Sequence, residues 1–280
     1  MSGHYKLPDG LVQIAFSGGR TSAYMLHQIL QENGDLPGRC VVSFQNTGRE
    51  LPETLDFVAE VGRRWGVKII WLEYRPQKPF FAIVGHNSAS RSGEPFEALI
   101  LKKKYLPNQH ARFCTAELKV RTAKRYLRSL EWDNWTNAVG IRSDEPHRLN
   151  KPKPKDRWTD WMPLAEAGVS RRTITEFWVR QAFDLQLPNV RGNCWLGNCD
   201  GCFLKSEANI AALVRDYPDR AIWWERMEGL VAEVTTSKAA GQFSKRYSRK
   251  ELRRYMERQG DLVLSNEGAL CQASEGECFS

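Results

Sequence analysis

The sequence contains no long apolar run. No stretch approaches the roughly 18 to 20 apolar residues that a membrane-spanning helix needs. The first residues, MSGHYKLPDG, lack the apolar segment of a signal peptide, and neither internal repeats nor low-complexity tracts occur. We therefore expect a protein of the cytoplasm that has no membrane partner and is not built from repeats.

The sequence also lacks an even set of cysteines. Seven cysteines in 280 residues do not suit a disulfide framework, which uses cysteines in pairs. Three of them crowd together at Cys194, Cys199 and Cys202. This clustering, in a chain expected to lie in a reducing compartment, favours a metal or cluster site over disulfide bonds.

The composition is that of an ordinary globular protein. Hydrophobic residues make up 41% of the chain and charged residues 26%, and the length fits one large domain or two smaller ones. The 41 Lys and Arg residues exceed the 33 Asp and Glu residues, which gives a net charge of +8. A positive field favours phosphate-bearing partners such as nucleotides or nucleic acid, although a solvated surface explains the surplus equally well.

Strand and helix patterns alternate in the first part of the chain. Short apolar runs predict strands at 11–16, 40–44 and 67–72, and amphipathic patterns predict helices at 21–31 and 52–66. A further helix at 115–130 and a strand at 136–141 continue the alternation. This βαβαβ order predicts the α/β class, with a Rossmann-like parallel sheet that carries helices on both faces.

The second part of the chain has a different character. Residues 150–160 are rich in Lys, Pro and Asp and are interpreted as a linker or an exposed loop. Helices are expected near 171–185, 206–216, 220–235 and 248–258, with no convincing strand, and the final 20 residues look loosely structured. We therefore place a nucleotide-binding domain at 1–160, followed by a mostly helical region at 161–280 that carries the cysteine loop and a flexible tail.

A glycine-rich segment between the first strand and the first helix is the best candidate for a phosphate site. Glycines let backbone N–H groups approach an anion, and the helix N-terminus adds a favourable dipole. Ser17, Thr21 and Ser22 supply three hydroxyl groups in the same segment. The segment fits neither the Walker A pattern nor the dinucleotide fingerprint, and a tight turn without a ligand is the alternative. The residues predicted to bind phosphate are Ser17, Gly18, Gly19, Arg20, Thr21 and Ser22.

This segment, SGGRTS, resembles the PP-loop of the adenine nucleotide alpha-hydrolase superfamily, the N-type ATP pyrophosphatases. The resemblance implies that the loop grips the pyrophosphate of ATP, bound with Mg²⁺, while the α-phosphate is attacked and the substrate is adenylated. Residues 46–54, NTGRELPET, resemble the D-T-G-x-x-x-P-E-T signature of the phosphoadenosine phosphosulfate (PAPS) reductase branch, which adds Asn46, Thr47 and Gly48 to the nucleotide site. Asn46 stands where the family has Asp, and Arg20 stands where Lys is commoner.

Two further blocks extend the resemblance over roughly residues 11–205. Residues 112–120, RFCTAELKV, are similar to the cysteine-containing R-K-V segment of the branch, and 140–148, GIRSDEPHR, resemble its G-x-R-x-D-E-S segment. The resemblance implies that Lys119, Arg142 and Arg148 face the nucleotide or an anionic substrate. An ordinary surface cation is the alternative for each of them.

The cysteines fit the same branch. Its iron–sulfur members carry a Cys-Cys pair in the block that here reads Phe113-Cys114, and a C-x-x-C further on. The resemblance implies a [4Fe–4S] cluster held by Cys114, Cys194, Cys199 and Cys202. The alternatives are a structural zinc site, thiols without a metal, and a three-cysteine cluster with one open iron, as in PP-loop tRNA thiolases.

The tail carries Cys271 and Cys278. Glu277-Cys278 resembles the start of the E-C-G-x-H ending of sulfonucleotide reductases, whose cysteine is the nucleophile, and this makes Cys278 a candidate catalytic residue. The Gly and His of that ending are absent, so incidental tail thiols are the simpler interpretation.

Three functions follow from these observations. The first is an ATP-using enzyme that adenylates an acceptor, tRNA or DNA, for sulfur transfer from an unidentified donor. The second is a sulfonucleotide (APS/PAPS) reductase, and the third is a nucleotide-binding, cluster-bearing regulator or complex subunit without turnover. The intact SGGRTS loop favours the first, because an ATP pyrophosphatase must bind a pyrophosphate. The expected partners are ATP or a related adenine nucleotide, the nucleic acid, and, in a homodimer, a second copy of the chain.

Overall fold

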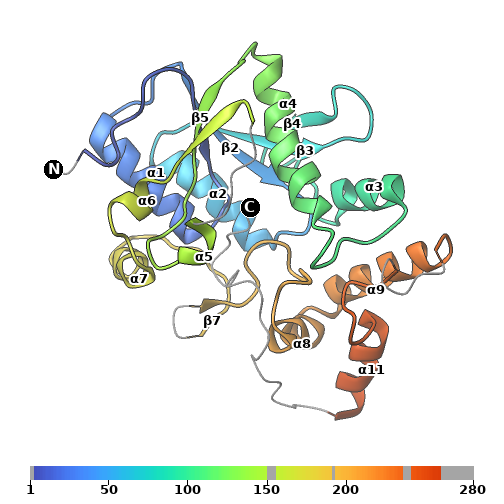
Figure 1. The fold of residues 1–280 in the computed structure, drawn as a ribbon. Coiled ribbons are helices and arrows are strands. Elements are labelled where there is room, and N and C mark those ends of the chain that lie inside the picture. The colour runs from blue at the N-terminus through green and yellow to red at the C-terminus, as the bar shows by residue number, and fades with distance from the viewer. Residues whose placement is uncertain (1–2, 150–155, 191–192, 236–240, 260–280) are drawn as a thin grey trace.

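The structure, a computed structural model, describes residues 3–149, 156–190, 193–235 and 241–259. It consists of a sheet layered between helices and, beside this layer, a helical unit whose described helices lie within residues 207–259 (Figure 1). None of the helices in these ranges is long and apolar enough to cross a membrane.

The sheet has six strands in the order β4-β3-β2-β1-β5-β6. The strands are β1 (Val12–Ala15), β2 (Cys40–Asn46), β3 (Ile69–Tyr74), β4 (Phe81–Val84), β5 (Trp135–Ala138) and β6 (Trp158–Trp161). All neighbours pair in parallel except β3 and β4, which pair antiparallel. The chain runs outward from β1 to one edge and then returns to add β5 on its other side. Ligands of such sheets bind outside the carboxyl ends of the strands at this switch point.

Helices cover both faces of the sheet (Figure 1). They are α1 (Arg20–Asn33), α2 (Pro52–Arg64), α3 (Glu94–Lys103), the π-helix η1 (Thr115–Arg121), α4 (Thr122–Ser129), α5 (Pro146–Leu149), α6 (Pro163–Glu166) and α7 (Arg171–Trp178). Successive residues of β3 point to opposite faces, as the pleat requires. Trp71 joins the large core with α1 and α2, whereas Leu72 joins a second core with Leu127 of α4.

The helical unit consists of α8 (Glu207–Asp216), α9 (Pro218–Ala232) and α11 (Arg249–Gln259), which pack against one another. Trp224 and Met227 of α9 are fully buried, and α9 also packs on α3. A hairpin of β7 (Asn189–Val190) and β8 (Asn193–Cys194) precedes this unit. The segment from 195 to 206 therefore connects the hairpin to α8 and carries Cys199 and Cys202.

The predicted βαβαβ core, the doubly covered parallel sheet and the helical C-terminal region are confirmed. Several local predictions were wrong. Strand β4 and helix α3 were missed, β6 begins inside the predicted linker, β7 and β8 form where no strand was expected, and α7 ends at 178 instead of 185. The missed strands have two to four residues, and both four-residue strands lie at sheet edges, so they show little apolar periodicity. The final 20 residues fall outside the described ranges, and the division at residue 160 stays a prediction.

Candidate nucleotide site and cysteine cavity

The glycine-rich loop lies at the carboxyl end of β1, where α1 begins. Gly18 has φ +80°, and a Cβ there would lie 3.0 Å from side-chain atoms of Phe44, Thr54 and Val58. Only glycine fits this left-handed, crowded position without strain. Gly19 is the N-cap of α1 and, having no side chain, leaves the first N–H groups of the helix without a side-chain cap. The loop and helix start thus offer backbone donors to an anion.

Two of the loop hydroxyls are used to shape the loop. The Ser17 and Ser22 hydroxyl oxygens lie 2.8 Å apart, and the Ser17 N–H donates to Ser22 Oγ at 3.2 Å. Ser22 Oγ also donates to the carbonyl of Gly19 at 3.1 Å. Ser17 and Ser22 therefore hold the loop closed around Gly18 and Gly19, a role that adds to the phosphate contacts predicted from the sequence.

The side chain of Arg20 points to a residue far along the chain. Its guanidinium donates Nε to Asp184 Oδ1 at 2.7 Å and a second N–H to the other carboxylate oxygen. The Trp178 indole donates to the Arg20 carbonyl at 3.0 Å. A lysine could not make this two-point contact, which accounts for arginine at a position where lysine is commoner.

Asn46, at the end of β2, is completely buried. Its amide donates to Glu73 Oε1 at 2.7 Å and to the Ser90 carbonyl at 2.8 Å, and its oxygen accepts from the Gly48 N–H at 3.1 Å. An aspartate here would place a second carboxylate beside the buried Glu73, so the amide is the compatible residue. Asn46 therefore shapes the turn that carries Thr47 and Gly48.

The segment after β5 approaches the loop from the other side. A Cβ on Gly140 would lie 3.3 Å from Ser22 Cα, and Arg142 Nη1 donates to Thr21 Oγ1 at 3.4 Å. Arg142 is buried, whereas Arg148 is half-buried and donates to Glu145 at 2.7 Å. The structure thus brings Arg142 to the predicted phosphate loop.

Lys119 lies in a different place, at a small cavity that three cysteines share. The cavity measures about 30 Å³ and is bounded mainly by apolar atoms. Its lining comprises Thr47, Cys114, Thr115, Leu118, Lys119, Asn198, Cys199, Cys202, Phe203 and Leu204. The Thr47 hydroxyl lies 3.3 Å from Cys199 Sγ and so connects the turn after β2 to this cavity. Burial, followed by the nearby Glu50 carboxylate, raises the pKa of the Cys199 thiol to about 12.

The fourth predicted ligand, Cys194, ends β8, and its side chain is not described. The predicted tail residues Cys271 and Cys278 lie outside the described residues. Of the predicted cysteine ligands, the structure therefore brings Cys114, Cys199 and Cys202 together. Across residues 3–149, 156–190, 193–235 and 241–259, no group of three or more His, Cys, Asp and Glu side chains is arranged to hold a single metal ion.

The side chain of Asn198 indicates whether the cavity can accommodate a bound group. Its side chain is 4% exposed and lines the cavity, yet neither Nδ2 nor Oδ1 has a hydrogen-bond partner within the described structure. A buried amide without partners costs about 1–3 kcal/mol per group, so such an amide is expected to face a ligand or water. The donor types around this apolar cavity, thiols and an unsatisfied amide, are those that a thiolate-bound cluster uses, since its sulfur atoms accept hydrogen bonds.

The cysteine loop is held by buried charges that sequence reasoning missed. Asp200, which is fully buried, accepts from Arg49 Nη2 and Trp224 Nε1, each at 2.7 Å, and from the Arg220 guanidinium. Lys205 donates to the Gly197 carbonyl at 2.7 Å. The signal that could have revealed Asp200 is its position inside the Cys199–Cys202 spacing, where a charged residue needs a partner.

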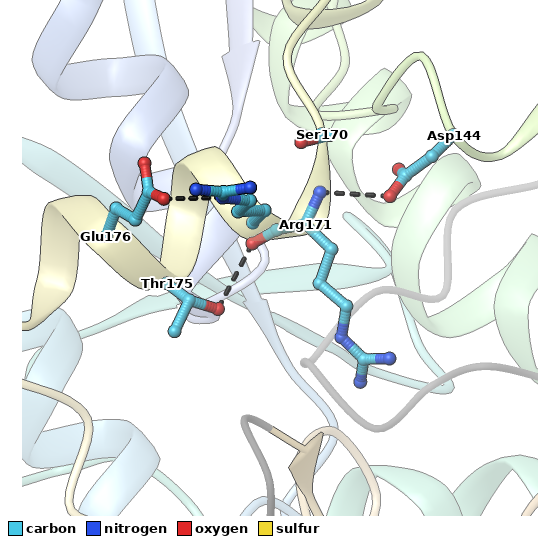
Figure 2. A pocket seen from close by; sticks show the side chains of 6 residues that line it. Asp144, Ser170, Arg171, Thr175 and Glu176 are labelled. Atoms are coloured by element: carbon cyan, nitrogen blue, oxygen red, sulfur yellow. Dashed lines mark hydrogen bonds and ion pairs between the residues drawn. The ribbon is translucent and has the colours of Figure 1, made fainter.

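A second, open pocket lies at the start of α7 (Figure 2). It encloses about 470 Å³ and is lined by Asp144, Ser170, Arg171, Arg172, Thr175 and Glu176. Asp144 accepts from the Arg171 N–H and from Arg142 Nε, each at 2.9 Å. Partial burial raises the pKa of Asp144, but these bonds outweigh it and lower the pKa below its ordinary value. Asp144 therefore ties α7 to the arginine beside the phosphate loop.

Comparison with known proteins agrees with this geometry. Residues 12–167, more than half of the chain, match the phosphoadenosine phosphosulfate reductase domain. The chain is similar to the uncharacterized nin region protein ORF290 of Escherichia phage lambda, with 35% identity over 219 residues, 72% of this chain and 69% of that protein. It is also 31% identical over 135 residues to an uncharacterized protein of Methanocaldococcus jannaschii, which covers 48% of this chain and 23% of the relative.

Among solved structures, a phosphoadenylyl-sulfate (PAPS) reductase from Candida auris in complex with phosphate is similar, with a TM-score of 0.43 and 13% identity. The match covers 64% of this chain and 75% of that one. On the domain match, the chain belongs to the phosphoadenosine phosphosulfate reductase family, a nucleotide-binding branch of the PP-loop superfamily.

Proposed function

We propose that the chain is an ATP-binding PP-loop enzyme that adenylates an acceptor, a nucleic acid, for sulfur transfer. The observation that carries this proposal is the loop at 17–22: Gly18 is left-handed, the start of α1 has no side-chain cap, and the buried Arg142 donates to Thr21. Backbone N–H groups and a guanidinium together suit a pyrophosphate. The reductase substrates APS and PAPS lack that group.

In the proposed reaction, an oxygen of the acceptor attacks the α-phosphorus of Mg²⁺-bound ATP. The bond from the α-phosphorus to the bridging oxygen breaks, and pyrophosphate leaves into the loop. A sulfur nucleophile at the oxidation level of sulfide then displaces AMP from the acceptor, so that no net oxidation or reduction occurs. The loop N–H groups and Arg142 stabilise the negative charge that develops on the leaving group.

We further propose that Cys114, Cys194, Cys199 and Cys202 hold a [4Fe–4S] cluster. When bound, a cluster with four cysteine ligands would supply electrons, whereas only the three-cysteine alternative would leave an iron open to hold sulfide. Lys119 lines the same cavity, and its cation would offset the negative charge of the thiolates. Asn198 would donate its amide N–H to sulfur, and Thr47, in contact with Cys199, joins this site to the nucleotide side.

A sulfonucleotide reductase is the second candidate. The match of residues 12–167 to the phosphoadenosine phosphosulfate reductase domain supports it. In that case Arg142 and the loop would bind the phosphate and sulfate groups of APS or PAPS, and a cysteine would attack the sulfate sulfur. The two candidates differ in one measurable respect, the nucleotide that the protein prefers.

Calorimetry on anaerobically purified protein tests the proposal by comparing ATP with Mg²⁺ against APS and PAPS. We expect ATP to bind more tightly, and Gly19→Val to abolish that binding by placing a side chain where the phosphate approaches. Gly38→Val is the matched control, because Gly38 is exposed and a Cβ there meets no atom within 4 Å. Preference for a sulfonucleotide would overturn the proposal in favour of the reductase. Unchanged ATP affinity in a folded Gly19→Val protein would remove the loop from the site.

A further inference from the structure

Helix α11 carries a row of exposed cations. Lys250, Arg254 and Arg258 follow one another at intervals of four residues, which places them on one side of the helix. All three are exposed, and none forms an ion pair with any residue that the structure describes. We call these three residues the α11 row.

The other basic residues of the helix have structural partners. Arg249 is buried and donates to the Gly201 carbonyl at 2.8 Å, while Arg253 pairs with Glu225 at 2.8 Å and with Glu257 at 2.6 Å. The acidic residues on either side of the row are engaged as well. Glu251 accepts from the Ser248 N–H at 2.7 Å, and Glu257 is the partner of Arg253. Lys250 and Arg254 lie near enough to Glu225 to help lower the pKa of that carboxyl, but Arg253 makes its direct ion pair. The row is therefore the part of this helix whose cations make no direct ion pair with a described residue.

The α11 row lies opposite the packed side of its helix. Leu252, two residues after Lys250, is buried, and α11 packs on both α8 and α9 (Figure 1). Since the apolar side of α11 is covered in this way, Tyr255 is the large apolar side chain that its described residues expose, and one ring does not make the apolar face that enters a lipid surface. A polar, negatively charged partner fits the row better than a membrane does.

The row also begins at the cysteine loop. Arg249, the first residue of α11, holds the carbonyl of Gly201, which lies between Cys199 and Cys202. From Lys250 to Arg258 the row extends about 12 Å along the axis, at roughly 1.5 Å per residue. A chain of phosphates that followed the row would therefore run toward the cysteine cavity.

We infer that the α11 row binds the sugar–phosphate backbone of a nucleic acid and directs the acceptor toward the cysteine cavity. That the bound nucleic acid is the acceptor rests on the proposed function; the binding surface itself rests on the charge and placement of the row. Lys and Arg side chains on phosphates position a nucleic acid without reading its sequence. Each such contact releases counterions, so affinity falls with salt.

The test uses the full chain and fluorescence anisotropy with a transfer RNA, a single-stranded DNA and a duplex DNA. The triple variant K250E/R254E/R258E is compared with K6E/K68E/K78E, which alters the net charge by the same amount at three exposed lysines elsewhere. We expect the row variant to lose affinity by at least about tenfold for one of the probes. For duplex DNA, the slope of log affinity against log salt concentration should become less steep by up to about three. The control variant should change affinity by less than about threefold.

Failure of the α11 row to bind nucleic acid can be distinguished from failure of the proposed ATP-dependent function. Both variants should keep the denaturation midpoint and the ATP affinity of the parent protein, and the ATP measurement reports on the nucleotide site independently of the row. Equal weakening by the two variants, no weakening by the row variant, or no binding of any probe by the parent protein would each overturn the inference. Binding of the row to phosphatidylserine vesicles in place of nucleic acid would overturn it as well.

Discussion

The loop predicted to bind phosphate, residues 17–22 and called the phosphate loop below, and the cysteine cavity are built in different ways. The loop is one stretch of the chain, residues 17–22, between a strand and its helix, and its donors are mainly backbone N–H groups. The cavity combines side chains from residues 47, 114–119 and 198–204, which are distant in the sequence. Backbone recognition can be specified locally, whereas side chains that must surround one point need the whole fold to bring them together.

The two regions are also stabilised differently. Hydroxyls and main-chain groups hold the phosphate loop, with Ser17 and Ser22 at its base. The cysteine loop is held by the buried carboxylate of Asp200 between Arg49 and Arg220. Breaking a buried ion pair leaves an uncompensated charge, which costs much more than losing one neutral hydrogen bond. The cysteine region should therefore be the more sensitive to single substitutions.

The largest effect is expected at the cysteine cavity itself. Cys199→Ala should lower the iron content of anaerobically purified protein on the order of tenfold or more and reduce stability together with it, because metal binding and folding are coupled. Iron and acid-labile sulfide analysis measures this. Cys40→Ala is the control, since Cys40 begins β2 and is not part of the described lining. Iron retained in Cys199→Ala, or lost equally in Cys40→Ala, would contradict the ligand assignment.

A large loss of stability is expected from Asp200→Ala. The variant leaves Arg49, whose side chain is 3% exposed, without its carboxylate, and we expect the free energy of unfolding to fall by about 3–5 kcal/mol. Asp216→Ala removes a carboxylate from an exposed pair with Arg215 and should cost about 1 kcal/mol or less. Urea denaturation of both variants measures the difference. Similar losses of unfolding free energy in the two variants would mean that the buried ion pairs of Asp200 stabilise the cysteine region no more than an exposed pair does.

Gly18→Ala in the phosphate loop is expected to lower stability less than Cys199→Ala or Asp200→Ala. The left-handed backbone costs about 1–2 kcal/mol for alanine, and the new Cβ also meets Phe44, Thr54 and Val58 at 3.0 Å. Gly34→Ala has a comparable φ of +69° but no atom within 4 Å, so it isolates the backbone cost. We expect Gly18→Ala to be the less stable of the two and to lose ATP affinity. Equal stability and unchanged ATP affinity would contradict the packed loop geometry.

Several parts of the fold could be predicted because their signals are local. Apolar runs and helical periodicity identified β1 to β3 with α1 and α2, and the loop between Phe16 and Thr21 follows from glycine at a strand-to-helix turn. The edge strands β4 and β6 were missed, because half-buried strands of four residues lack a clear pattern. The position of β6 also depends on pairing with β5, whose paired residues lie 23 positions earlier, whereas β4 pairs with the nearby β3 and lacked only a clear pattern of its own.

Part of the candidate site could not be predicted for the same reason. The sequence placed Lys119 and Arg142 in one group of cations, but Lys119 lines the cysteine cavity whereas Arg142 contacts Thr21 of the phosphate loop. Asp184 lies more than 160 residues from its partner Arg20. An ion pair between such distant residues leaves no trace in the spacing of a single sequence.

By itself, the sequence determined the chemistry that is available: a glycine loop after a strand, cysteines spaced for a shared centre, and a surplus of positive charge. Those properties depend on residue type and on short-range backbone geometry, which neighbouring residues specify. Only the tertiary structure decided which side chains meet. It put Thr47 against Cys199, Asp200 between two arginines and Asn198 at the cysteine cavity, because burial and charge pairing act between segments that the fold alone brings into contact.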